Sequence, residues 1–322
     1  QYPSFQAIYQ FGDSISDTGN DVHLGTICAR PPYGETTFKR PTGRCSNGLI
    51  MVDYFAMAFK IPFLNPFMDT SADFSHGANF AVAAASAITA SNISLIYQVG
   101  WFKSLLPKIC TSQADCKQKL RNSLFVVGEI GGNDYNGPSF ARGVSAQSLL
   151  GVVPLVIDAI GLGVQELISV GATRMVVPGN LPVGCMTFYL AGYKSSDPKA
   201  YDQFGCLKDW NDLATYHNNL LQAKLKTIQQ QHPDVKIAYG DYFNNFITIL
   251  RNPPAYDGIL KACCGAANTE YNFDKLHFCG TPGVSSCPDP NARLIWDGGH
   301  LTQRGNQVMA DLLMKQFLPL LN

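Results

Sequence analysis

Short runs of β-branched and aromatic residues predict five strands along the chain. Each run is four or five residues long and is separated from the next by a much longer stretch. The five runs are Ala7–Phe11, Asn79–Val82, Leu124–Val127, Arg174–Val177 and Lys236–Tyr239.

Longer stretches between these runs place apolar residues three and four positions apart, which is the spacing of an amphipathic helix. They are Ser94–Leu106, Ala146–Val170, Asp209–Gln231 and Gln303–Phe317. Strands that alternate with helices favour an α/β fold, here a three-layer α/β/α arrangement around a mostly parallel five-stranded sheet. In such sheets ligands bind beyond the carboxyl ends of the strands, so the residues just after each strand are the first candidates for a site.

Two segments, Val22–Asn47 and Arg251–Asn291, are rich in Gly, Pro and Cys and show little periodicity. We expect long loops held by disulfides there. The chain has no internal repeat and no shift in composition that would mark a boundary. We therefore expect a single domain over residues 1–322, although the length alone would allow two.

Charge excludes one class of function. The 24 Lys and Arg residues balance 24 Asp and Glu residues, the formal net charge is +0, and no dense basic cluster occurs. Proteins that bind nucleic acids usually present a basic patch to the phosphates. We therefore expect no nucleic-acid partner.

The most apolar run, Leu149–Val164, is shorter than the roughly 18 to 20 residues that a membrane span requires. It also contains Pro154 and Asp158. The prediction is a buried helix and no membrane span.

Cysteine usage points to a compartment. No Cys-X-X-Cys pair is present, so disulfides are favoured over a zinc site. Disulfides imply the secretory pathway and an extracellular or vacuolar location. The connectivity stays open, but Cys110–Cys116 and Cys185–Cys206 close short loops and are favoured, and Cys263 and Cys264 should take different partners, with Cys279 and Cys287 nearest. The ten cysteines are these eight together with Cys28 and Cys45.

The first residues, Gln1–Gln6, lack the basic start and apolar stretch of a signal peptide. A secreted origin would mean that the signal peptide has already been removed. Asn92 lies in the only Asn-X-Ser/Thr sequon and is a candidate for glycosylation.

The first candidate site follows the first predicted strand. Ser14 stands after Gly12 and Asp13 at a predicted strand-to-helix turn, where its hydroxyl would project over the sheet edge with a helix N-terminus behind it. This position suits a nucleophile. The alternative is that Ser14 or Asp13 only caps a helix, which is the commoner role of such residues.

A second candidate follows the third predicted strand. Gly131 and Gly132 would let the backbone pass close to a ligand, and the amide of Asn133 could donate to a developing oxyanion. An ordinary Gly-Gly-Asn-Asp turn is the alternative.

The third candidate lies directly before the last predicted helix. Asp297 precedes His300 by three residues in a Gly-Gly loop, so its carboxylate could accept the imidazole Nδ1–H and leave Nε2 as a base. The other five histidines lack such a context. We expect His217 and His277 among them to be packing or surface residues.

These motifs occur in the order of a known family, and the chain resembles the plant-type GDSL esterase/lipase group of the SGNH hydrolase superfamily. The resemblance runs essentially from end to end and implies the flavodoxin-like SGNH hydrolase fold. Ile15 stands where the family usually has Leu. The matching segments are Gly12–Ile15, Gly131–Asp134 and Asp297–His300, with Pro41–Arg44, Val177–Pro182 and Cys263–Gly265 typical of the plant branch.

The resemblance implies a catalytic triad in which Ser14 is the nucleophile, His300 the base and Asp297 the residue that orients it. It also implies an oxyanion hole built from the backbone N–H of Ser14, a second backbone N–H after the second strand and the Asn133 amide. No metal ion and no organic cofactor is expected.

The block that supplies the second N–H departs from the family pattern. Ala84 takes the place of the usual glycine, with Ala83 the next alternative and Gly77 a third. The N–H of Ala84 could still serve if φ there is negative. Its methyl group would narrow the acyl side of the pocket.

The first two blocks look most similar to acetylesterases of plant alkaloid metabolism, the acetylajmalan esterase type. This implies an acetyl ester of a specialised metabolite, such as an indole alkaloid, as the substrate. A lipase, an esterase for phenolic choline esters and a GDSL-type acyltransferase remain alternatives, and a non-catalytic binding protein would be a different class. The expected partner is a small-molecule ester, and the oligomeric state is open, with a monomer favoured.

Overall fold

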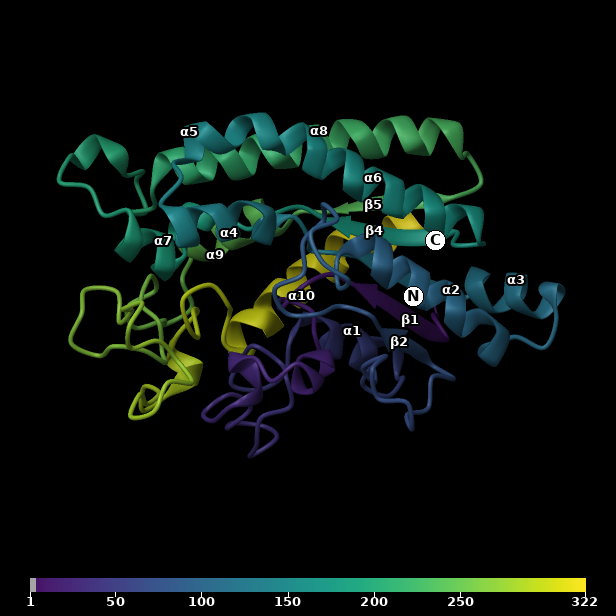
Figure 1. The fold of residues 1–322 in the computed structure, drawn as a ribbon, viewed down its shortest axis with the longest axis horizontal. Helices are drawn as coiled ribbons and strands as arrows, with labels where there is room; N and C mark the ends of the chain where they lie inside the picture. The colour runs from purple at the N-terminus through teal and green to yellow at the C-terminus, as the bar shows by residue number, and fades with distance from the viewer. Residues whose placement is uncertain (1–3) are drawn as a thin grey trace.

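A five-stranded parallel sheet forms the centre of the computed structural model, which describes residues 4–322 (Figure 1). The strand order is β2-β1-β3-β4-β5, and every neighbouring pair is parallel. The α/β prediction is therefore confirmed. The strands are β1 (Ala7–Phe11), β2 (Gly77–Asn79), β3 (Ser123–Val127), β4 (Arg174–Pro178) and β5 (Lys236–Gly240).

Helices cover both faces of the sheet and complete the three layers (Figure 1). On one face α6 packs against α2 and α8, and on the other α1 packs against α10. Their bounds are α1 (Met51–Phe59), α2 (Leu95–Ile109), α6 (Val153–Ser169), α8 (Lys208–Gln231) and α10 (Gln303–Phe317). The remaining α-helices are α3 (Gln113–Arg121), α4 (Gly132–Arg142), α5 (Ala146–Leu149), α7 (Thr187–Gly192) and α9 (Tyr242–Arg251).

The second strand lies earlier than predicted, at Gly77–Asn79 instead of Asn79–Val82. The chain still follows β1 after Asn79, because Phe80 N–H bonds Gln10 O at 2.7 Å. The Asn79 side chain then hydrogen-bonds backbone groups that no strand pairs. Its oxygen accepts from Ala81 N–H at 2.9 Å, and its amide donates to Ser16 O at 2.6 Å. Val82 N–H then bonds Gly12 O at 3.2 Å, so the chain follows the end of β1 as far as the site.

The predicted helix over Ala146–Val170 is divided. A short 3-10 turn over Leu150–Val152 separates α5 from α6, and Pro154 lies in the first turn of α6, where its missing N–H costs nothing. By length and composition Ala146–Ser169 is apolar enough to cross a membrane, with a mean hydropathy of 1.8, so the expectation that this run is too short is wrong. In this fold α6 is a packed helix that buries Val156 and Ile160.

Five disulfides hold the long loops, and the favoured pairings are confirmed. The pairs are Cys28–Cys45, Cys110–Cys116, Cys185–Cys206, Cys263–Cys287 and Cys264–Cys279. Three of these bonds lie in the segments that were predicted to be loops. There Cys28, Cys45, Cys264 and Cys279 pack with Tyr33 and Trp296 in a small second core. This core joins the loop after β1 to the loop before α10, at the carboxyl edge of the sheet.

Candidate active site

Ser14 lies in a tight turn directly after β1. The Asp13 carbonyl accepts from Ser16 N–H at 3.1 Å and Asp17 N–H at 3.0 Å, but no helix follows, and a 3-10 helix begins only at Asn20. The expected helix N-terminus behind Ser14 is therefore wrong. The Ser14 hydroxyl caps no helix either, because its hydrogen bond is to His300.

Gly12 makes this turn possible. Its φ is +144°, and a Cβ there would lie 2.7 Å from Glu129 O, so only glycine lets the chain after β1 pass the chain after β3 at this distance. The close passage brings Ser14 next to the segment between β3 and α4, which leads directly into Asn133.

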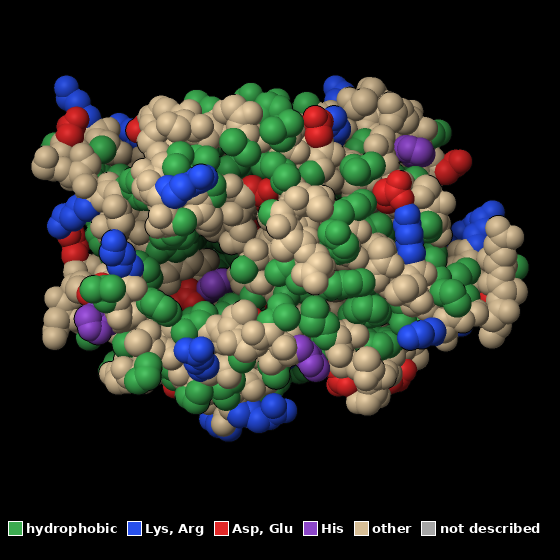
Figure 2. Space-filling model, in the orientation of Figure 1, with side chains coloured by type: hydrophobic (Ala, Val, Ile, Leu, Met, Phe, Trp, Pro, Cys, Tyr) green, Lys and Arg blue, Asp and Glu red, His purple; other side chains and the backbone are tan. Residues whose placement is uncertain are grey.

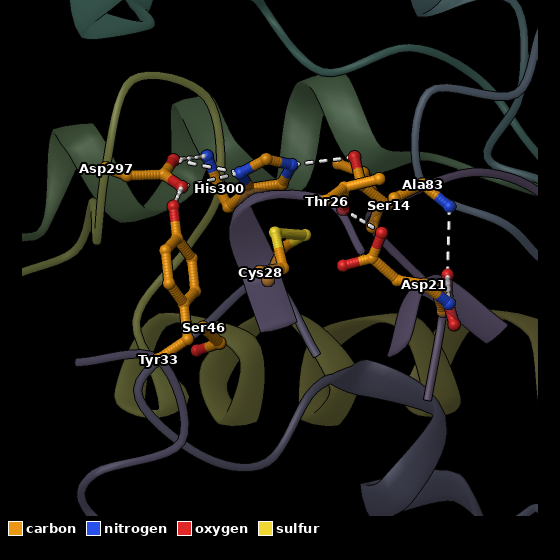
Figure 3. Close-up of a disulfide and its surroundings, with 12 residues drawn as sticks. Ser14, Asp21, Thr26, Cys28, Tyr33, Ser46, Ala83, Asp297 and His300 are labelled. Atoms are coloured by element: carbon orange, nitrogen blue, oxygen red, sulfur yellow. Dashed lines mark hydrogen bonds and ion pairs between the residues drawn. A yellow bond between two sulfur atoms is a disulfide. The ribbon is translucent and has the colours of Figure 1, made fainter. Parts of the chain in front are cut away.

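The three residues of the predicted triad meet at the carboxyl edge, as Figure 3 shows. Ser14 Oγ lies 2.7 Å from His300 Nε2, and His300 Nδ1 lies 2.8 Å from Asp297 Oδ2 and 2.9 Å from Asp297 Oδ1. A carboxylate can only accept, so Nδ1 carries the proton and the lone pair of Nε2 faces the Ser14 hydroxyl. This is the geometry of a nucleophile with its base and the group that orients the base.

The charge on Asp297 is stabilised by several donors. Asp297 Oδ1 accepts from Gly299 N–H and His300 N–H, both at 2.9 Å, and Oδ2 accepts from the Tyr33 hydroxyl at 2.5 Å. Burial alone would raise the pKa of this carboxyl, but His300 and these donors outweigh burial and lower the pKa below its usual value. Burial likewise opposes a charge on His300, yet Asp297 raises the pKa of the imidazole.

Asn133 lies in the first turn of α4, beside Ser14. Its Nδ2 donates to Ala85 O at 2.9 Å and approaches Asp13 Oδ2 at 3.4 Å. The amide is thus held between the loop after β1 and the loop after β2.

Ala84 has a φ of +69°, so the condition of a negative φ, under which its N–H was expected to serve, is not met. The left-handed conformation costs an L-residue roughly 1–2 kcal/mol. Within residues 4–322 the N–H groups of Ser14 and Ala84 have no protein acceptor, whereas the N–H of Ala83 donates to Asp17 Oδ2 at 2.9 Å. Gly77 N–H is also taken, by Phe74 O at 3.2 Å. Of Ala84, Ala83 and Gly77, only Ala84 therefore has a backbone N–H without a protein acceptor among the described residues.

Two carboxyls, one buried and one half-buried, hold the segment that carries Ala84. Asp17 accepts from Ala83 N–H, and Asp134 accepts from Ala87 N–H at 2.8 Å and Ile88 N–H at 3.0 Å. The segment is thus fixed from the β1 side and from the β3 side. This bracing maintains the strained backbone at Ala84.

Glu129 forms a carboxyl pair with Asp13 beneath the nucleophile, and the sequence analysis did not single it out. Burial is the main reason that the pKa of Asp13 rises to about 6 and that the pKa of Glu129 rises well above its usual value, and the side chains are hydrogen-bonded to each other. Glu129 also accepts from Gly132 N–H at 3.3 Å. Burial therefore favours the protonated form of both carboxyls.

A cavity of about 590 Å³ opens over Ser14 and His300. Its wall is largely apolar, and Figure 2 shows it as a hollow with histidine and acidic atoms at its floor. Aromatic side chains from three segments line it: Phe140, Phe188, Phe273 and Phe278. A second cavity, of about 660 Å³, lies at Gln6, Tyr9 and Phe74 and contains none of the candidate residues.

His217 and His277 are a packing and a surface residue, as expected. His217 is buried, its Nδ1 lies 2.7 Å from the Tyr135 hydroxyl, and burial lowers its pKa to about 3. His277 lies on the surface beside Asp274. Within residues 4–322 no group of three or more His, Cys, Asp or Glu side chains could hold a metal ion.

Comparison with known proteins connects this geometry to a family. The family model for GDSL-like Lipase/Acylhydrolase matches residues 8–313. Two GDSL esterase/lipases of Arabidopsis thaliana are 39% and 40% identical to the chain, over 96% and 98% of it and 84% and 87% of their own lengths. Acetylajmalan esterase 1 of Rauvolfia serpentina is 37% identical, over 98% of the chain and 87% of its own length. The chain therefore belongs to the GDSL-like lipase/acylhydrolase family of carboxylic ester hydrolases.

Proposed function

We propose that the protein is a serine esterase that works through an acyl-enzyme. The observation that carries the proposal is the continuous hydrogen-bonded path from Ser14 Oγ through His300 to Asp297. His300 Nε2 takes the Ser14 proton as Oγ attacks the ester carbonyl, and it returns that proton to the departing alcohol oxygen. Water then attacks the acyl-enzyme by the same steps in reverse.

The oxyanion of each tetrahedral intermediate would be held by Ser14 N–H, Ala84 N–H and the Asn133 amide. The two backbone donors have no protein acceptor among residues 4–322, and the amide is fixed beside them by Ala85 O. Donors that are already in place need no reorganisation when charge develops, so losing one typically costs about 10²- to 10³-fold in rate.

We infer that the substrate is an acetyl ester of a bulky, largely apolar alcohol, such as an indole alkaloid. Ala84 lines the same cavity as Ser14, and its methyl group favours a small acyl group. The aromatic wall favours a flat apolar alcohol, because stacked or edge-on rings add to the free energy of burial. The likeness to acetylajmalan esterase 1 supports the same class.

The alternatives within the family are a lipase, an esterase for phenolic choline esters and an acyltransferase that passes the acyl group to another alcohol.

We propose the secretory pathway, with an extracellular or vacuolar destination, because no free cysteine remains beside the five disulfides in residues 4–322.

Covalent labelling tests the mechanism. A fluorophosphonate should label the wild type, and Ser14→Ala should abolish both labelling and ester turnover. Ser16→Ala is the matched control, since this serine lies in the same turn but is buried away from His300, and it should still be labelled. Labelling of Ser14→Ala at the wild-type rate would overturn the proposal.

An acyl-length series tests the substrate class. For p-nitrophenyl esters, kcat/KM should be highest for acetate and fall steadily with chain length, and acetylated alkaloids should be hydrolysed. A maximum at long acyl chains would point to a lipase instead. Running the series with an added alcohol, and looking for a transferred product, separates the acyltransferase.

A further inference from the structure

Tyr33 contacts the triad from a loop that no sequence motif connects to it. Its hydroxyl donates to Asp297 Oδ2 at 2.5 Å, and its side chain is 2% exposed (Figure 3). The ring packs edge-on against Trp296, the residue before Asp297, with ring centroids 5.9 Å apart. Tyr33 and Asp297 are separated by 264 positions in the sequence, so only the fold brings them together.

The loop that carries Tyr33 is fastened to the His300 segment on both sides. The Cys28–Cys45 disulfide closes it, and Gly34 N–H bonds Ser46 O at 2.9 Å. Ser46 Oγ then donates to Leu301 O at 2.8 Å, directly after His300. The tyrosine is therefore presented by a covalently closed loop whose position relative to the catalytic histidine is set by hydrogen bonds.

The Tyr33 hydroxyl is the only side-chain donor to the Asp297 carboxylate in residues 4–322 besides His300. Oδ1 is already occupied by the N–H groups of Gly299 and His300, so the hydroxyl fixes the rotation of the carboxylate from its other oxygen. By donating this hydrogen bond, the hydroxyl also stabilises part of the negative charge of Asp297 and so weakens the attraction between Asp297 and His300. Burial and the nearby Asp297 raise the pKa of Tyr33 well above its usual value, so the phenol keeps its proton.

We propose that Tyr33 is a positioning residue for ester hydrolysis: its hydroxyl orients the Asp297 carboxylate and moderates its pull on His300. This inference rests on the proposed function, because it assigns Tyr33 a part in the same reaction. The triad would then have a fourth member that is supplied by the disulfide-closed loop.

The test is the pH profile of Tyr33→Phe, which keeps the ring and removes only the hydroxyl. We expect kcat/KM to fall about tenfold, as for the loss of a hydrogen bond to a charged group. The acid limb of the profile should move to higher pH, because Asp297 without this donor binds the imidazolium proton more strongly. A limb that stays in place or moves to lower pH overturns the proposal, whatever happens to kcat.

Two controls isolate the effect. Tyr193→Phe also removes a tyrosine hydroxyl with two hydrogen bonds, to Ser139 O and Val144 O, but away from the triad, and it should leave the limb unchanged. In an Asp297→Asn background, Tyr33→Phe should cost less than twofold, because residues that act through one another are not additive. A full tenfold loss in that background contradicts the role of Tyr33.

A failure of the proposed function can be distinguished from a failure of the role proposed for Tyr33. If Ser14→Ala keeps wild-type turnover, the mechanism itself is wrong. If turnover depends on Ser14 but Tyr33→Phe has the wild-type pH profile, only the role of Tyr33 is lost.

Discussion

Asp297 and Asp13 are both buried carboxyls that flank the hydrogen bond between Ser14 and His300, yet their pKa values move in opposite directions. The pKa of Asp297 is lowered, and that of Asp13 rises to about 6. Both lose water on burial. The balance between burial and donors differs. The imidazole and three further donors outweigh burial at Asp297, whereas at Asp13 burial outweighs the hydrogen bonds from Ile15 N–H and Glu129. Burial alone therefore does not decide the charge of a carboxyl; the donors around it do.

The comparison assigns the two residues different tasks. In the proposed mechanism, Asp297 keeps the negative charge that stabilises the imidazolium of His300. Asp13 and Glu129 form a buried carboxyl pair below the nucleophile, and Asp13 also accepts from Ile15 N–H at 3.0 Å and approaches the Asn133 amide. They serve as structural support for the turn and for the proposed oxyanion donor.

The largest effect is expected from replacing each aspartate by asparagine. Asp297→Asn should lower kcat by about 10³- to 10⁴-fold, because the amide no longer stabilises the correct imidazole tautomer and its charge. Asp13→Asn, the matched change on the other side, should cost less than tenfold. Steady-state kinetics on p-nitrophenyl acetate measures both, and equal losses would break the distinction between the two sites.

A smaller effect is expected from opening the loop that carries Tyr33. The Cys28→Ser/Cys45→Ser double variant should lose about 3 kcal/mol of stability, the value for a loop of this length, and about tenfold in kcat/KM as Tyr33 moves from Asp297. Urea unfolding and kinetics report the two losses.

The control for this variant is Cys110→Ser/Cys116→Ser, which opens a short loop between α2 and α3, away from the site. It should leave kcat/KM unchanged. A tenfold loss there as well would show that activity follows general stability and not the Tyr33 contact.

The smallest effect on activity is expected at Glu129, where the change is in the pH dependence of stability. The pKa of Glu129 is raised by folding, so its contribution is fully present below its ordinary value of 4.5 and is lost as the pH rises towards the folded pKa. Over that pH range the free energy of unfolding should fall by up to about 1.4 kcal/mol per pH unit on account of this one proton. Glu129→Gln keeps a donor for Asp13 but cannot ionise, so its melting temperature should fall less than that of the wild type between pH 5 and pH 8.

Calorimetry across this pH range makes the measurement. Glu166→Gln, at a half-exposed pair with Lys103, is the control and should follow the wild-type curve. If the melting temperature of Glu129→Gln changes with pH as that of the wild type does, the pKa of Glu129 is not raised by folding.

Local pattern was sufficient for several elements and for the triad. Helix α10 has the predicted bounds, since apolar residues recur at helical spacing and Thr302 caps its start by accepting from Gly305 N–H. Helix α9 was missed although it carries a comparable signal, with Asp241 as its cap and a strong apolar face. Strand β2 was misplaced because only three residues pair and the apolar Phe80–Val82 beyond them resembles a strand better.

The residues around the triad were harder to find. Tyr33 and Glu129 have no local signature, since a tyrosine in a cysteine-rich loop and a glutamate before Gly-Gly fit many roles. Their importance comes from neighbours distant in sequence: Asp297 for Tyr33 and Asp13 for Glu129.

The sequence by itself determined the α/β class, the four candidate site side chains and two of the five disulfides, because these depend on spacing and residue chemistry. Only the tertiary structure decided which of three backbone donors after β2 is free, which carboxyls keep a charge and which loop supports the aspartate. Those properties depend on burial and on hydrogen bonds between distant segments, and a linear pattern contains neither.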